Sequence, residues 1–109
     1  MAVPEKDLAR IRRWCEAWVS DESPERVRLE EETDDKHVVL YKRHAPWRDG
    51  EKATTEIVAR LRYSKKTGLW RLHWVDRAGK FHHYDKFPAR DVQSLLDFLS
   101  TTKDPVFWG

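Results

Sequence analysis

The segment TEIVARLRYSKKTGLWRLHWVDRAGKFHHY, which covers residues 55–84, decides the fold. Apolar and polar residues alternate over residues 55–64, over residues 69–75, and from residue 80 to residue 86, just past the end of the segment. This period of two is typical of β-strands with one buried face. The two connecting segments have four residues each and end on glycine, which suits hairpin loops between antiparallel strands. The segment therefore predicts three strands of an antiparallel meander.

Two more strands are predicted upstream of this segment. Residues 26–30 alternate between charged and apolar side chains, and residues 37–43 are apolar on both faces at their centre. A turn is expected within residues 32–36. The following loop, residues 44–50, contains a proline and an Asp-Gly pair, which interrupt β-ladders. The pattern thus predicts five strands that pair in sequence order.

One helix is predicted on each side of these strands. Pro4 suits the first turn of a helix, which is expected to end at residues 21–24. Its buried face is predicted from apolar residues at three- and four-residue spacing: Leu8, Ile11, Cys15, Trp18 and Val19. Asp91 is predicted to cap the second helix. The residues of that helix expected to face the sheet are Val92, Leu95, Leu96, Phe98 and Leu99.

The composition is that of a folded domain with an aromatic core. Of the 109 residues, 39% are hydrophobic and 37% are charged, and six are tryptophans. Each buried aromatic side chain removes about 150–250 Å² from water, so the aromatics supply core volume. This length is usual for one domain. We expect residues 1–109 to form a single α+β domain: an N-terminal helix, a five-stranded antiparallel meander, a C-terminal helix and a docked aromatic tail.

The sequence predicts a cytoplasmic location. Cys15 is the only cysteine, so no internal disulfide is possible and a reducing compartment is expected. The N-terminus lacks the basic and apolar regions of a signal peptide. No apolar run approaches the roughly 20 residues of a membrane helix. We expect a bacterial cytoplasmic protein without a membrane partner, and no feature of the sequence indicates an oligomeric state.

The net charge of +2 conceals two regions of opposite charge. Residues 21–35 contain eight acidic residues and two arginines, a balance of −6. Residues 36–90 contain fourteen lysines and arginines and five acidic residues, a balance of +9. A basic body of this kind attracts anionic partners whatever the total charge.

The predicted hairpins collect basic side chains on one face of the sheet. A four-residue loop pairs Ser64 with Leu69, which gathers apolar residues on the face that the helices are expected to cover. The basic residues then lie on the other face. The opposite pairs expected there are Arg62 with Arg71, Arg60 with His73, His73 with His82, and Arg71 with Tyr84.

These side chains suit a nucleic acid, because guanidinium groups bind phosphates and flat rings stack on bases. Like charges directly opposite each other are unfavourable by roughly 0.2–1 kcal/mol per pair, so compensation is expected. It can come from carboxylates elsewhere in the chain, from a solvent anion or from the phosphates of a ligand. The first hypothesis is a non-enzymatic module that binds an anionic partner, RNA or DNA. Its candidate binding residues are Arg60, Arg62, Arg71, His73, His82 and Tyr84.

Three other interpretations are open. In the first, the face is an ordinary polar surface, either solvated or neutralised by the acidic residues 30–35. In the second, the protein is a metal-independent ribonuclease, in which His73, His82 and Tyr84 supply acid–base chemistry beside the arginines. In the third, the aromatic tail, residues 106–109, is a protein-interaction motif that a partner captures by its carboxylate.

No metal or cofactor site is predicted. His82 and His83 are adjacent on a strand and therefore point to opposite faces. Cys15 lies on an apolar helical stripe, where a buried and unreactive thiol is expected. The four glycines do not form a glycine-rich loop that would bind a nucleotide.

Several motifs occur in an order that resembles a known family. The Trp-rich strand LWRLHWV (residues 69–75) is followed by KFHHY (residues 80–84), and the sequence closes on Asp-Pro and FWG (residues 107–109). Within residues 43–47, an Arg, a Pro and a Trp are similar to an Arg-Pro-x-Trp loop, although two residues separate the Arg from the Pro here. Together these motifs resemble the family of small bacterial proteins catalogued as domain of unknown function 3024. The resemblance implies no activity, since none is assigned to the family. The family-like positions are Trp47, Trp70, Trp74, Phe107, Trp108 and Gly109.

Overall fold

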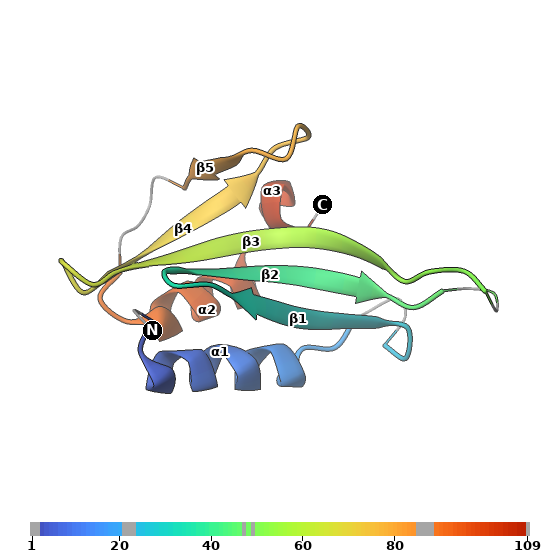
Figure 1. The fold of residues 1–109 in the computed structure, drawn as a ribbon, viewed down its shortest axis with the longest axis horizontal. Coiled ribbons are helices and arrows are strands. Elements are labelled where there is room, and N and C mark those ends of the chain that lie inside the picture. Colours follow the sequence, from blue (N-terminus) through green and yellow to red (C-terminus); the bar gives the residue numbers. More distant parts are fainter. Residues whose placement is uncertain (1–2, 21–23, 47, 49, 85–88, 109) are drawn as a thin grey trace.

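The computed structural model describes residues 3–20, 24–46, 48, 50–84 and 89–108. In this part of the chain, five antiparallel strands form one sheet in the order β1-β2-β3-β4-β5, as predicted. A helix precedes the sheet and two helices follow it (Figure 1). The elements are α1 (Glu5–Ala17), β1 (Val27–Thr33), β2 (His37–His44), β3 (Thr54–Ser64), β4 (Leu69–Val75), β5 (Phe81–His83), α2 (Val92–Thr101) and α3 (Pro105–Trp108).

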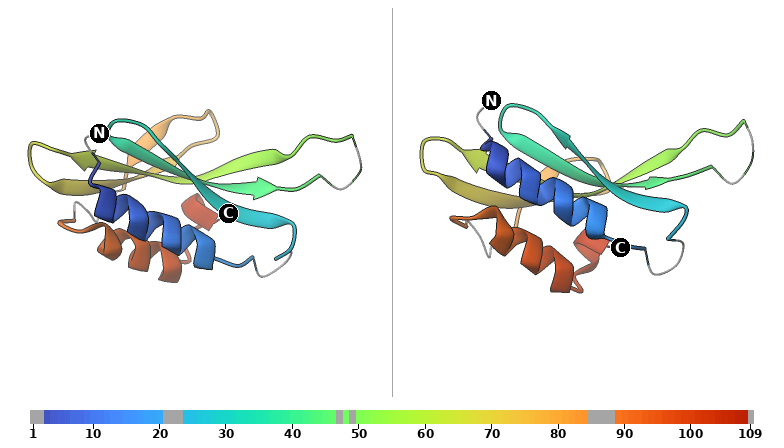
Figure 2. Two further views of the ribbon diagram at one scale, coloured as in Figure 1. Left: turned by 60° about the horizontal axis from the view of Figure 1, so that its bottom comes forward. Right: turned by 90° about the horizontal axis from the view of Figure 1, so that it is seen from below.

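The helices lie along one face of the sheet, so the fold has two layers (Figure 2). Helices α1 and α2 pack against each other, and the indole Nε1 of Trp14 donates a hydrogen bond to the hydroxyl of Ser100 at 2.8 Å. Asp91 caps α2 as expected, because its carboxylate accepts the amide hydrogen of Ser94 at 2.9 Å. The predicted α+β class and strand order are therefore confirmed.

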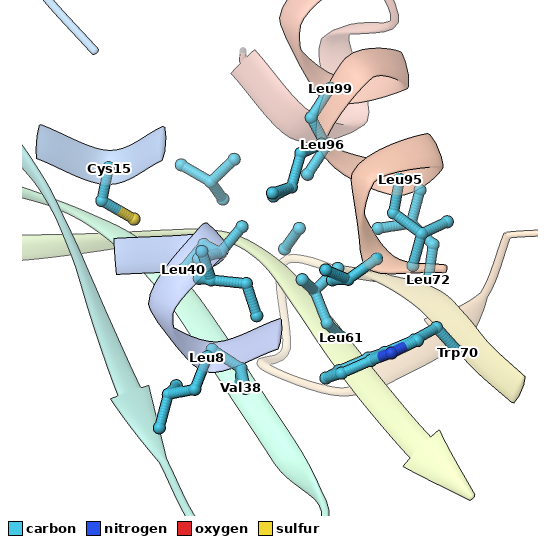
Figure 3. Packing of buried hydrophobic residues seen from close by; sticks show 14 of the residues in the cluster. Leu8, Cys15, Val38, Leu40, Leu61, Trp70, Leu72, Leu95, Leu96 and Leu99 are labelled. Carbon is cyan, nitrogen blue, oxygen red and sulfur yellow. The ribbon is translucent and has the colours of Figure 1, made fainter. Parts of the chain in front are cut away.

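The core fills the space between the helices and the sheet (Figure 3). Each large apolar side chain that becomes buried there stabilises the fold by about 1.5–3 kcal/mol. Trp70 is fully buried, and its Nε1 donates to the carboxylate of Asp7 in α1 at 3.3 Å. The other large, fully buried side chains are Ile11, Leu40, Leu61, Leu72, Leu95, Leu96, Leu99, Val3, Val38, Val58 and Val92.

The end of α1 differs from the prediction. The helix stops at Ala17, and Trp18 already has an extended backbone with φ −71° and ψ 134°. Residues beyond this point no longer follow the helical spacing. Val19 therefore does not join the buried face but is 65% exposed, so its predicted burial is wrong. Trp18 is half-buried instead of fully buried.

The aromatic tail docks on the core, as expected. Its short helix α3 contacts both β3 and β4. Phe107 is buried within it. Trp108 stacks on Trp18 with ring centroids 5.8 Å apart, and its Nε1 donates to the carbonyl oxygen of Leu99 at 2.9 Å.

The predicted register of the β3–β4 hairpin is confirmed. Ser64 pairs with Leu69, and Arg62 pairs with Arg71. The loop between them has four residues, and the amide of Gly68 donates to the carbonyl oxygen of Ser64 at 2.7 Å. For the β4–β5 hairpin, the predicted register is wrong by one residue. Its pairs are His73 with His83, Trp74 with His82, and Val75 with Phe81.

The side chain of Asp76 explains this slip. Asp76 Oδ1 accepts the backbone amides of Ala78 at 2.9 Å and Lys80 at 3.0 Å, and the amide of Asp76 donates to the carbonyl oxygen of Lys80 at 2.8 Å. Asp76 and Lys80 thus close a loop of three residues that ends on Gly79, whose φ of +84° suits glycine. A change of one residue in the loop turns every side chain of β5 to the opposite face. The strand begins at Phe81 and ends at His83, so the predicted strand, residues 80–86, is wrong at Lys80 and Tyr84. Asp85 and Lys86, also predicted in it, lie outside the described residues.

Candidate anion-binding face

The face of the sheet opposite the helices, here called the open face, gathers four of the six predicted site residues. The register places Arg60 opposite His73 and Arg62 opposite Arg71, with β2 on one side and β5 on the other. The central part of this face is formed by His37, Val39, Arg60, Arg62, Arg71, His73, Phe81 and His83.

His82 and Tyr84 do not lie on the open face, which corrects the predicted set. His82 pairs with Trp74 on the helix side, and the two rings stack with centroids 4.7 Å apart. Its Nε2 lies 2.6 Å from the Oδ2 of Asp76. The ring of Tyr84 packs against Phe107, and its hydroxyl donates to the carboxylate of Asp104. The same one-residue slip accounts for both.

His83 takes the place predicted for His82. It is exposed and lies opposite His73, with ring centroids 4.6 Å apart. The signal that would have identified it is Asp76 at the start of an Asp-Arg-Ala-Gly loop, because an aspartate at this position can bond the loop amides and shorten the loop.

His73 is a buried, neutral histidine on this face. Only 3% of it is exposed, and its Nδ1 accepts a hydrogen bond from the Nε of Arg60 at 3.2 Å. Burial, followed by the positive charge of Arg60, lowers the pKa of His73 to about 4. His73 therefore holds Arg60 in place as a neutral acceptor at pH 7. The Arg60 guanidinium also lies 4.0 Å from the centroid of the Phe81 ring.

Arg62 and Arg71 are the accessible cations of the face. Both are exposed, and they face each other directly across β3 and β4. With Ser64, Thr67, Leu69 and His83, they line a depression of about 250 Å³. We call this depression the cation pocket. Guanidinium, imidazole and hydroxyl groups together form a set of hydrogen-bond donors suited to an anion.

The described acidic residues of the β1 region do not neutralise these arginines. Glu30 lies 3.6 Å from Arg43, and Glu31 lies 3.2 Å from Arg12 on the helix side. Asp34 contacts His37. Burial, followed by the charge of Arg62, lowers the pKa of Arg60, and the charge of Asp34 offsets this only in part. Among the residues that the structure describes, no carboxylate forms an ion pair with any of three arginines: Arg60, Arg62 and Arg71.

The family-like aromatic positions serve the fold. Trp70 is buried, Trp74 stacks on His82, and Phe107 and Trp108 belong to the docked tail. Trp47 and Gly109 lie outside the described residues. Within the described ranges, no group of three or more His, Cys, Asp or Glu side chains is placed to hold a metal ion.

The fold and the face define an α+β domain whose antiparallel meander is covered by helices on one side and carries arginines on the other. The sequence profile of the family described as "Domain of unknown function (DUF3024)" matches residues 2–109, and the chain belongs to this family. The resemblance noted in the sequence is thereby confirmed. Comparisons with curated proteins and with solved structures gave no match. None of the described helices is long and apolar enough to span a membrane.

Proposed function

We propose that the protein is a non-enzymatic module that binds single-stranded RNA or DNA through the phosphates, with the cation pocket as the centre of the site. The observation that carries the proposal is that Arg62 and Arg71 lie directly opposite each other on β3 and β4. Both are exposed, and neither forms an ion pair with a carboxylate among the described residues. Such a pair destabilises the sheet by roughly 0.2–1 kcal/mol unless an anion lies between the two charges.

The surroundings of the pair support a phosphate ligand. An arginine guanidinium binds phosphate through two parallel N–H groups, and two arginines side by side present two such pairs of donors. The hydroxyls of Ser64 and Thr67 supply further donors at the edge of the pocket. Arg60, which contacts both His73 and Phe81, adds positive charge beside it. These groups contact the backbone of a nucleic acid, so no sequence preference is expected.

Two placements favour binding over ribonuclease chemistry. His73 and His82, the acid–base pair of that alternative, point to opposite faces of the sheet. His73 is also buried, with its Nδ1 occupied by Arg60. The third alternative, a presented tail, is disfavoured by the burial of Phe107 and the stacking of Trp108 on Trp18.

The test is the affinity for a short fluorescent single-stranded RNA, measured by anisotropy over a series of salt concentrations. The logarithm of the association constant should fall with the logarithm of salt by about 0.7 for each phosphate neutralised. The Arg62→Gln/Arg71→Gln double variant should lower this slope by about 1.4, since two phosphate contacts are lost.

The matched control is Arg13→Gln, which removes an exposed cation from α1 on the opposite layer. It should leave both affinity and slope almost unchanged. Absence of binding at low salt, or a double variant that binds as tightly as the wild type, would discard the proposal.

A further inference from the structure

The outer edge of β1 has backbone groups that no other strand covers. The carbonyl oxygen of Arg26 accepts from Ala45, and the amide of Asp34 donates to His37, so even-numbered residues of this region face β2. Backbone direction alternates along a strand. The N–H and C=O groups of Val27, Leu29 and Glu31 therefore point away from the sheet, and within the described chain none of their amides has a hydrogen-bond partner.

A groove runs beside this edge. Helix α1 packs against β1 and lies along it (Figures 1 and 2). The space between the end of α1 and β1 measures about 730 Å³, and we call it the edge groove. Its apolar lining includes Trp18, Val19 and Val27. Val19 is 65% exposed and is one of two large hydrophobic residues left exposed in the described chain.

The residues that line the edge groove include one more carboxylate than guanidinium group. The carboxylates belong to Glu16, Glu30 and Glu31, and the guanidinium groups to Arg12 and Arg28. Glu31 pairs with Arg12 and Glu30 with Arg43, so Glu16 is the lining carboxylate that has no ion pair among the described residues. Cys15 also lines the groove. Burial raises the pKa of its thiol to about 12, and the three glutamates contribute further to the increase.

A groove between a sheet edge and a helix is the geometry in which an extended peptide adds to a sheet as a further strand. We propose that the edge groove binds an extended peptide in which apolar residues alternate with basic ones, and that this peptide pairs with β1 as a sixth strand. Its backbone would bond to Val27, Leu29 and Glu31. Alternate side chains would then lie on Trp18 and Val19, and the intervening basic ones would lie beside the carboxylates of β1 on the open face.

This site is separate from the cation pocket. The pocket lies on β3, β4 and β5, whereas the groove lies at β1, on the opposite edge of the sheet. The two sites also select opposite charges. The peptide site therefore stands whether or not the protein binds nucleic acid.

The test begins with a displayed library of random extended peptides, selected against the full chain. Enriched peptides should carry Lys or Arg at alternate positions, with apolar residues between them. On binding of an enriched peptide, hydrogen exchange at the amides of Val27, Leu29 and Glu31 should slow by at least about tenfold. Val19→Lys should weaken binding by about tenfold or more, because it places a charge on the apolar surface of the groove.

The matched control is Ile57→Lys, which alters the other exposed large hydrophobic residue, on β3. It should leave peptide affinity unchanged. An enriched peptide should also lose binding when it is N-methylated on the residues that pair with β1, and keep it when it is methylated on the intervening residues. Failure of any peptide to enrich, enrichment without basic residues, protection at other amides, or equal effects of the two methylation patterns would overturn the proposal.

Discussion

The two faces of this sheet are built from the same strands but carry different side chains. On the helix side, β2, β3 and β4 supply fully buried apolar side chains that pack under α1 and α2. On the open face, the neighbouring positions of the same strands carry Arg60, Arg62 and Arg71. His73 is the exception, because it lies on the open face and is only 3% exposed. The face on which a side chain lies therefore does not by itself determine whether that side chain is buried.

The largest expected effect on the free energy of unfolding comes from a substitution on the helix side of the sheet. Phe107→Ala should lower the free energy of unfolding by about 3–5 kcal/mol, because it removes a buried ring and leaves a cavity between α3 and the sheet. Urea denaturation measures the loss. Phe81→Ala, on the open face, is the control and should cost clearly less, since Phe81 is only half-buried. Equal losses would mean that the open face also carries a core.

The second effect concerns His73 and depends on pH. Its pKa is lowered to about 4 in the folded state, whereas the unfolded chain binds the proton near pH 6.5. The unfolded state therefore binds more protons as the pH falls, and the stability that is present above pH 6.5 is lost on the way to pH 4. The contribution of His73 to this loss should be roughly 3 kcal/mol.

The comparison that isolates this contribution is His73→Gln, which keeps a hydrogen-bond acceptor near the Nε of Arg60. Stability curves of the two proteins, measured by urea denaturation from pH 7 to pH 4, should diverge as the pH falls, with the wild type losing more. Parallel curves would show that His73 binds its proton as readily in the folded state as in the unfolded chain, so that its pKa is not lowered by burial.

The smallest effect is at Arg71. Arg71→Gln should leave stability unchanged or raise it by roughly 0.2–1 kcal/mol, because it relieves the opposition to Arg62. Thermal unfolding at low salt gives the most sensitive comparison, since added salt screens the repulsion. A loss of more than about 1 kcal/mol would mean that Arg71 has a stabilising partner, which would remove the reason for a bound anion.

How much of this was predictable from the sequence is clearest in the two hairpins. The β3–β4 register follows from a loop in which only Gly68 needs special backbone geometry, so counting residues was sufficient. In the β4–β5 loop, the outcome depends on whether the Asp76 side chain bonds to the amides of Ala78 and Lys80. Counting the residues of the loop does not reveal that bond. The predicted register was therefore wrong by one residue, and two of the six predicted site residues lie on the other face.

The remaining differences have similar causes. The exposure of Val19 depends on where α1 ends, and apolar periodicity continues past that point in the sequence although the helix does not. The burial of His73 depends on neighbours from two other strands, Arg60 and His83, that alternation alone does not bring into contact. In each case, the pattern predicted the element correctly, whereas the environment at its end or on its surface came from tertiary contacts.

The order β1-β2-β3-β4-β5 also has a consequence for how the chain folds. Each strand pairs with its neighbour in the chain, so the sheet grows by closing short loops, which is entropically cheap. The bond between Trp14 and Ser100, by contrast, joins residues 86 positions apart. We expect the central hairpins to form before the two helices dock on each other. Substitutions in β3 and β4 should then slow folding, whereas those between α1 and α2 should mainly speed unfolding.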